Sequence, residues 1–238
     1  RRRQERSVNV CRLLVGTSRL RLNLDQRRPF RLAALWAATR HMMTLPMVRH
    51  SIFVQTLVFT LLFSAISLIQ PTFDLIFERG DQFAIFFFAV GAFCASSSLV
   101  NAIFVMRYGM RAIISLAIAI TLGLTAIMLV LSLIGLNAKV YFWVYVVWQG
   151  VIFYQMGLTI GNLNALAMEP LGHIAGLAAS VMGAISTISA GILATLIAQL
   201  FNQTTLPQIV GSLIALTLAV PSLIRMRRLD RPAETSQR

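Results

Sequence analysis

The chain has 238 residues, of which 57% are hydrophobic and 12% are charged, and its formal net charge is +13. Soluble domains carry about 25% charged residues, so this composition excludes an ordinary soluble domain and indicates a membrane protein. The two cysteines, Cys11 and Cys94, have no motif spacing and support neither a disulfide framework nor a metal site.

The first fifty residues are rich in arginine and precede the long apolar stretches. Residues 1–26 show no hydrophobic periodicity, so we expect a basic, disordered segment, and no apolar region of a signal peptide follows the first arginines. Residues 27–50 are expected to form a cytoplasmic linker. Within residues 27–43, Leu35 and Trp36 lie near one helical face and arginines lie elsewhere, which predicts a short amphipathic helix at the membrane interface.

Five long stretches without Asp, Glu, Lys or Arg follow the linker. A bilayer core about 30 Å thick is crossed by roughly 20 apolar residues in a helix, so the first four stretches each hold one span. The fifth is too long for one span and is divided by the polar sequence FNQTTLP. Helices are expected because lipid offers no partner for backbone amides. The predicted all-α bundle covers residues 51–224, with spans at 51–71, 83–106, 112–135, 140–162, 171–200 and 207–224.

An even number of spans places both termini on one side of the membrane. All but two of the 21 lysines and arginines lie in the first fifty residues, in the connection between the second and third spans, or in the basic tail at residues 225–238. Basic segments of this kind lie in the cytoplasm, so the sequence predicts a multi-pass protein of the cell inner membrane with cytoplasmic termini. Because the arginines are divided among segments that flank spans, contact with anionic headgroups is favoured over nucleic-acid binding.

The connection between the first and second spans carries the main acidic cluster, Asp74, Glu78 and Asp81. Three carboxylates can bind a cation, but ordinary solvated loop charge is the favoured interpretation. Pro71 is expected to end or kink the first span, because it lacks an amide donor and clashes with the preceding turn.

The connection between the second and third spans reads MRYGMR. Gly109 allows a tight turn there, because glycine adopts backbone conformations that other residues avoid. Arg107 and Arg111 flank the glycine, where they can contact headgroups or the C-terminal dipole of a neighbouring helix.

The sequence AMEPLGHIAGLAAS opens the predicted fifth span. Pro170 suits a first helical position, where its missing amide costs nothing, and Glu169 complements the positive end of the helix. Glu169 and His173 are one turn apart and could exchange a proton. Both lie at the membrane edge, however, where capping and gating are the favoured roles.

Small residues then recur at every fourth position in two series, one through Gly172 and Gly176 and the other through Gly183 and Gly191. This spacing lets two helix backbones approach closely in lipid. We therefore expect the fifth span to pack tightly against a neighbouring helix.

No Asp, Glu, Lys or Arg lies within a predicted span, so no carboxylate is available at the midplane for ion coupling. Uncharged polar residues favour a cavity lined by the first, second, fourth and fifth spans, with the third and sixth facing lipid. The alternative is that these side chains hydrogen-bond between helices. Tyr145 and Gln149 share a helical face beside Trp148, which suits a bulky, partly apolar ligand. The candidate residues of a substrate path are Gln55, Ser67, Asn101, Tyr145, Trp148 and Gln149.

Several other classes of six-span protein are excluded. A membrane serine protease needs a G-x-S motif in a span, an aquaporin needs paired N-P-A sequences, and an ATPase needs a Walker loop, and the spans contain none of these. We expect a protein that is not an enzyme and that binds no metal or cofactor.

Parts of the sequence resemble a known family. RYGMR after the second predicted span resembles the loop signature of the major facilitator superfamily between its eighth and ninth helices. AMEPLGHIAGLAAS resembles the motif that opens the eleventh helix in the Bcr/CflA group of multidrug efflux transporters, and SSLVNAIFVMRYGMR is similar to that group's stretch before the loop. The resemblance covers roughly residues 27–224, and the chain departs from the group's pattern at Ile103, Leu177 and Ala179.

The resemblance implies the C-terminal half of a twelve-span, proton-coupled multidrug efflux transporter. Such halves consist of three-plus-three inverted repeats, and the substrate site lies between the two halves. The implied partners are the lipid bilayer, an amphipathic drug-like substrate and an N-terminal six-helix half, with the proton gradient as coupling source. The residues expected to serve the cytoplasmic gate and helix packing are Arg107, Gly109, Arg111, Glu169, Pro170, Gly172, Gly176 and Gly183.

Two alternatives stay open on the sequence. The chain could be a non-transporting six-span scaffold, including a truncated gene remnant, or a half-transporter that assembles as a homodimer. In the favoured interpretation the chain is inactive alone.

Overall fold

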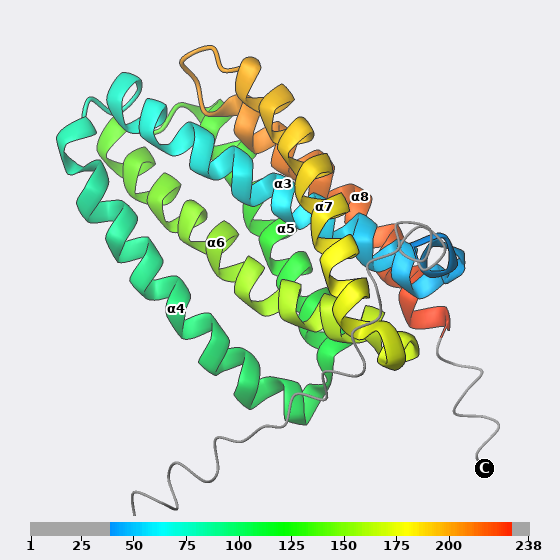
Figure 1. Ribbon diagram of the computed structural model, residues 1–238. Coiled ribbons are helices and arrows are strands. Elements are labelled where there is room, and N and C mark those ends of the chain that lie inside the picture. Colours follow the sequence, from blue (N-terminus) through cyan, green and yellow to red (C-terminus); the bar gives the residue numbers. More distant parts are fainter. Residues whose placement is uncertain (1–38, 230–238) are drawn as a thin grey trace, which may run out of the picture. The chain divides into compact units, whose positions relative to one another are not determined.

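The computed structural model describes residues 39–229 (Figure 1). The predicted basic segment at residues 1–26 lies outside the described residues. So do residues 27–38, with most of the predicted amphipathic helix, and residues 230–238 of the basic tail.

Within residues 39–229, a helical segment at residues 39–44 is followed by six long helices and two short 3-10 helices, and no strand occurs among them. All six long helices are long and apolar enough to cross a membrane, which confirms the predicted number of apolar helices and suits a membrane-spanning protein. The long helices are α3 (Pro46–Leu75), α4 (Phe83–Tyr108), α5 (Met110–Ile134), α6 (Ala138–Met168), α7 (Ala175–Gln199) and α8 (Leu206–Leu229). The 3-10 helices are η2 (Gly80–Gln82) and η3 (Glu169–Ile174).

Pro71 does not end the first span. It lies inside α3, which continues to Leu75. Proline removes a backbone hydrogen bond, but the next two residues, Thr72 and Phe73, are buried against neighbouring helices and keep the chain in the helix.

The fifth span begins later than predicted. Pro170 lies in the first turn of η3, and α7 begins at Ala175 rather than at residue 171. Within η3, Leu171 has non-helical backbone angles (φ −115°, ψ 22°) and a fully buried side chain. The buried leucine fixes a break between α6 and α7 that the helix-start pattern around Pro170 did not predict.

The long helices form two layers. α4, α6, α3 and α7 lie side by side in that order, while α5 packs on α6, α8 packs on α3, and α5 and α8 contact each other (Figure 1). α3 is the most buried of the six, whereas α4 and α7 at the ends of the row are the least buried. Together α3 and α6 therefore form the centre of the bundle.

The packing repeats itself when the first three helices are exchanged with the last three. The exchange pairs α3 with α6, α4 with α7 and α5 with α8. It turns the α3–α7 contact into α6–α4, the α3–α8 contact into α6–α5, and the α4–α5 contact into α7–α8. All six contacts occur in the structure. Phe73 near the end of α3 meets Phe142 near the start of α6, so these helices run in opposite directions. The bundle is an inverted repeat of two three-helix units.

The two ends of the bundle differ in charge. The end that carries Asp74 in the last turn of α3, with Glu78 and Asp81 between α3 and α4, is termed the acidic-loop end. At the opposite end, Arg111 at the start of α5 and Arg227 at the end of α8 line one surface pocket, and this is termed the arginine end.

Candidate functional site

A buried hydrogen-bonded group joins α6 to α8 toward the acidic-loop end. Gln149 Nε2 donates to Tyr145 Oη at 2.5 Å and to Gln208 Oε1 at 3.1 Å, and Gln208 Nε2 donates back to Gln149 Oε1 at 3.2 Å. The Tyr145 hydroxyl donates to Gln208 Oε1 at 3.2 Å. No more than 1% of any of these side chains is exposed. Tyr145, Gln149 and Gln208 are termed the amide–tyrosine cluster.

Trp148 ties the same part of α6 to α5. Its Nε1 donates to Thr125 Oγ1 at 3.0 Å, and the Thr125 hydroxyl donates in turn to the Thr121 carbonyl at 2.7 Å. α5 and α8, the third and sixth spans, thus supply the partners of Trp148 and Gln149, although both helices were expected to face lipid. In this structure the three adjacent candidates bond helices together, which is the alternative that the sequence left open.

Aromatic rings enclose the amide–tyrosine cluster at the acidic-loop end. Phe77 lies 5.3 Å from the Tyr145 ring and 5.1 Å from the Phe142 ring, measured between centroids. The Arg79 guanidinium lies 4.3 Å above the Phe142 centroid, a cation–π distance. A hydrogen bond between the hydroxyls of Tyr141 and Thr205 adds a further link from α6 to the residue before α8.

The other three path candidates lie apart from this group. Gln55 of α3 is 2% exposed, and its Oε1 has no hydrogen-bond partner within residues 39–229. Asn101 of α4 accepts a hydrogen bond from Asn162 Nδ2 of α6 at 2.7 Å. Ser67 is exposed on α3. The unpartnered oxygen of Gln55 is the feature that a water or a ligand group would satisfy, because an unpaired buried acceptor is costly.

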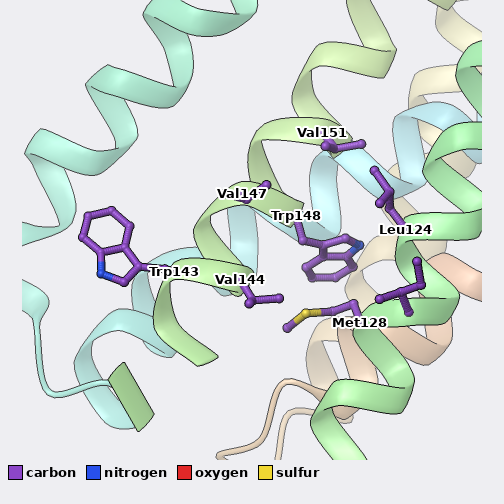
Figure 2. A pocket seen from close by; sticks show the side chains of 8 residues that line it. Leu124, Met128, Trp143, Val144, Val147, Trp148 and Val151 are labelled. Carbon is purple, nitrogen blue, oxygen red and sulfur yellow. The ribbon is translucent and has the colours of Figure 1, made fainter. Parts of the chain in front are cut away.

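A cavity of about 270 Å³ opens between α5 and α6 beside Trp148. Figure 2 shows Trp148 pointing toward Leu124 and Met128 of α5, whereas Trp143 lies toward α4, where its ring packs 5.6 Å from that of Phe86. The lining residues are Leu124, Ile127, Met128, Trp143, Val144, Val147, Trp148 and Val151. An apolar lining of this kind suits an acyl chain or the apolar part of an amphipathic ligand.

The predicted glycine turn between the second and third spans is confirmed. Gly109 is the single residue between α4 and α5. Its backbone angles, φ 79° and ψ 156°, lie in a region that essentially only glycine occupies. Arg107 is exposed and lies 5.4 Å from the Tyr108 ring. Arg111 is half-buried and faces α8.

The glycine series of the fifth span meets no neighbour in the described part of the chain. A Cβ added at Gly172, Gly176, Gly183 or Gly191 would find no atom of another element within 4 Å. The buried stripe of α7 is instead Ala178, Met182, Ser186, Ala190 and Ala194. On that stripe Ser186 Oγ donates to the Ile52 carbonyl of α3 at 3.3 Å. Within residues 39–229, α7 therefore packs through this stripe and not through the glycine series, whose packing role stays a prediction.

Close helix contacts occur at two other glycines. A Cβ on Gly157 of α6 would lie 1.9 Å from Ser97 Oγ of α4, and one on Gly211 of α8 would lie 2.7 Å from Ile197 Cδ1 of α7. Glu169 is exposed in the first turn of η3.

Sequence reasoning missed three partners of the candidate residues, namely Gln208, Thr125 and Asn162. Each is a polar residue in or at the end of an apolar span, and that is the signal that could have found them. Within the described residues, no group of three or more His, Cys, Asp and Glu could hold a metal ion.

No known protein family, curated protein or solved structure matches the chain. The class that the fold and its polar interior define is a helical bundle of membrane-spanning type, built from two inverted three-helix repeats.

Proposed function

We propose that the chain is the C-terminal six-helix half of a proton-coupled multidrug efflux transporter of the inner membrane. The inverted repeat carries the proposal, because secondary transporters are commonly built from such repeats and move one bundle against the other around a substrate site. The resemblance of RYGMR and AMEPLGHIAGLAAS to the major facilitator superfamily supports the same assignment. In this assignment the arginine end is cytoplasmic.

A rocking bundle must move as one body, and the interior suits that requirement. The amide–tyrosine cluster joins α6 to α8, and Trp148 joins α6 to α5, so hydrogen bonds from adjacent residues tie α6 to both helices. Breaking one of these hydrogen bonds leaves a polar group unpaired in an apolar interior, which is costly. The bonds therefore favour a single arrangement of the helices. These residues therefore stiffen the half, and Gly109 and the break at Leu171 are the points where helices can change their angle.

In this proposal the substrate path follows polar side chains that are exposed or lack a hydrogen-bond partner within the described residues. Gln55 offers an unpartnered buried oxygen, and Ser67 is exposed on the same helix. The glycines of α7 that meet nothing within the described chain present a small-residue face for the N-terminal half. Because residues 39–229 carry no acidic residue inside the predicted spans, the proton-carrying groups belong to the N-terminal half.

Two measurements test the proposal. Reading the gene upstream of residue 1 is expected to give an in-frame continuation with six further spans. Purified chain in liposomes is expected not to transport an amphipathic cationic dye across the membrane when a proton gradient is imposed, because the substrate site lies between the two halves and is incomplete in this chain. A stop codon upstream, or dye movement driven by the chain alone, would contradict the assignment.

A further inference from the structure

The inverted repeat gives each buried residue of α6 a counterpart in α3. Gln55 of α3 and Gln149 of α6 are both buried glutamines. When Gln149 is aligned with Gln55, every buried residue of α6 falls on a buried residue of α3. The repeat therefore pairs Gln55 with Gln149 and, one turn earlier, Ser51 with Tyr145.

The same alignment relates α5 to α8. The buried residues of α5 include Ile114, Ile118, Thr121, Thr125 and Met128. The buried residues of α8 include, with the same spacing, Gln208, Ser212, Ala215, Ala219 and Ser222. Ile114 is therefore the counterpart of Gln208.

The two sets of counterparts differ in their hydrogen bonds. Toward the acidic-loop end, the side chains of the amide–tyrosine cluster bond to one another. Toward the arginine end, where α3 begins, the counterparts are Ser51, Gln55 and Ile114. Ser51 Oγ and Gln55 Oε1 are buried and have no hydrogen-bond partner within residues 39–229, and the hydrocarbon side chain of Ile114 can offer none. One repeat is thus satisfied by its own side chains, whereas the other leaves two buried polar atoms open.

A third open oxygen lies at the same depth on α6. Val48 of α3 and Ala167 of α6 belong to one apolar cluster, and the two helices run in opposite directions. Ser51 and Asn164 each lie slightly less than one turn deeper in the bundle than these two residues. Asn164 Oδ1 is also buried without a partner within residues 39–229. The open atoms therefore gather at one level of the bundle.

The satisfied repeat shows which group fits the open one. An open polar atom in an apolar interior is costly unless a bound group or water pairs with it. Gln149 Oε1 accepts its hydrogen bond from the carboxamide Nε2 of Gln208. The group missing at Gln55 is therefore a neutral N–H donor, and a charged group is disfavoured because a buried charge costs more than a buried amide.

We propose that Ser51 and Gln55 form a buried binding site for the carboxamide group of a ligand. The two residues are four apart on one helix, so their side chains lie on the same face and one carboxamide can bond to both. Gln55 Oε1 accepts from the amide nitrogen, and the Ser51 hydroxyl donates to the amide oxygen. The inference rests on the proposed function for the role of the ligand: because Gln55 lies on the proposed path, the substrate is an amphipathic molecule that carries an amide.

The test measures binding of propionamide to the purified full chain in neutral detergent by saturation-transfer NMR. Propionamide matches the end of a glutamine side chain. Gln55→Leu is expected to weaken its binding about fivefold, which is the loss of one hydrogen bond. The matched control Gln70→Leu, at an exposed position of the same helix, is expected to leave binding unchanged. Ile114→Gln is expected to block binding, because it supplies a carboxamide from the chain itself.

Several results would overturn the inference. Equal binding to the unaltered chain and to Gln55→Leu is one, and no binding to either is another, because the open atoms then hold water only. Propylammonium or propionate that binds as strongly as propionamide would also overturn it, since a charged group then fits the site. If Ile114→Gln does not fold, the comparison of Gln55→Leu with Gln70→Leu still decides the question.

The failure of this inference is distinguishable from the failure of the proposed function. Propionamide binding is measured on the chain alone, so the site stands even if no transport is found with an N-terminal half. Transport without propionamide binding would overturn the site and leave the proposed function in place.

Discussion

The reciprocal pair of amides at Gln149 and Gln208 gives the sharpest test of how this bundle is held together. Gln149→Leu removes three hydrogen bonds, two to Gln208 and one to Tyr145, at a site with no exposed surface. Hydrogen bonds between membrane helices contribute about 0.6 kcal/mol each on average, so the loss is about 2 kcal/mol. The Gln208 amide also keeps an unpaired donor, which adds about 1 kcal/mol. We expect a total destabilisation of about 3 kcal/mol.

A double-mutant cycle separates the pair from its surroundings. Gln208→Leu is expected to cost a similar amount, and the double variant is expected to fall at least about 1 kcal/mol short of the sum, because the two reciprocal bonds are lost only once. The free energy of unfolding is measured in mixed micelles by titration with sodium dodecyl sulfate, with tryptophan fluorescence as the signal. Thr217→Val serves as the control, since its residue is exposed and its hydroxyl, within residues 39–229, bonds only to the Leu213 carbonyl of its own helix. Additive single effects, or a Gln149→Leu variant as stable as the control, would refute the cluster as a link between α6 and α8.

The remaining predictions concern single side chains and are measured by the same unfolding titration. Trp148→Phe is expected to cost about 1 kcal/mol through the bond to Thr125, and Thr125→Val about the same; a cost in only one of the two variants would contradict the bond. Gly109→Ala is expected to lower the free energy of unfolding by about 1–3 kcal/mol, because a residue with a Cβ is strained at φ 79° and ψ 156°. Gly123→Ala, in the middle of α5 with open space around it, is expected to be neutral or stabilising. Equal effects of the two variants would show that the turn at Gly109 carries no strain. Gly157→Ala is expected to separate α4 from α6 and destabilise the chain by about 1–3 kcal/mol, while Gly176→Ala is tolerated in the isolated chain. A larger destabilisation by Gly176→Ala than by Gly157→Ala would place the close helix contact on the glycine series of α7.

The number of apolar helices could be predicted from the sequence because charged residues separate the first four spans and the polar sequence FNQTTLP separates the last two. The ends were less predictable. α3 begins at Pro46 and α6 continues to Met168, several residues beyond the predicted spans at 51–71 and 140–162. α3 continues past its charge-free stretch through Arg49 and Asp74, because a helix can extend from the hydrocarbon into the interface. α6 instead fills its charge-free stretch to the end at Met168, so the length that a bilayer requires underestimated this helix.

The candidate site was predictable in its residues but not in its partners. Tyr145, Trp148 and Gln149 were identified as one polar face of α6, and the structure does place them together. Their partner Gln208 is 59 residues from Gln149, and the pairing depends on which face α8 turns toward α6. Small residues at every fourth position likewise indicate a helix suited to close contact, but the pattern does not say whether the contact is made within the chain or with another bundle.

The most direct test of the central proposal is transport in everted inner-membrane vesicles. The vesicles would contain the chain together with the six-span product of the upstream reading frame, and ethidium accumulation would be followed after the proton gradient is generated. The proposal predicts accumulation that a proton uncoupler abolishes and that vesicles with the chain alone do not show. Accumulation that is equal with and without the chain, or that is insensitive to the uncoupler, would contradict it.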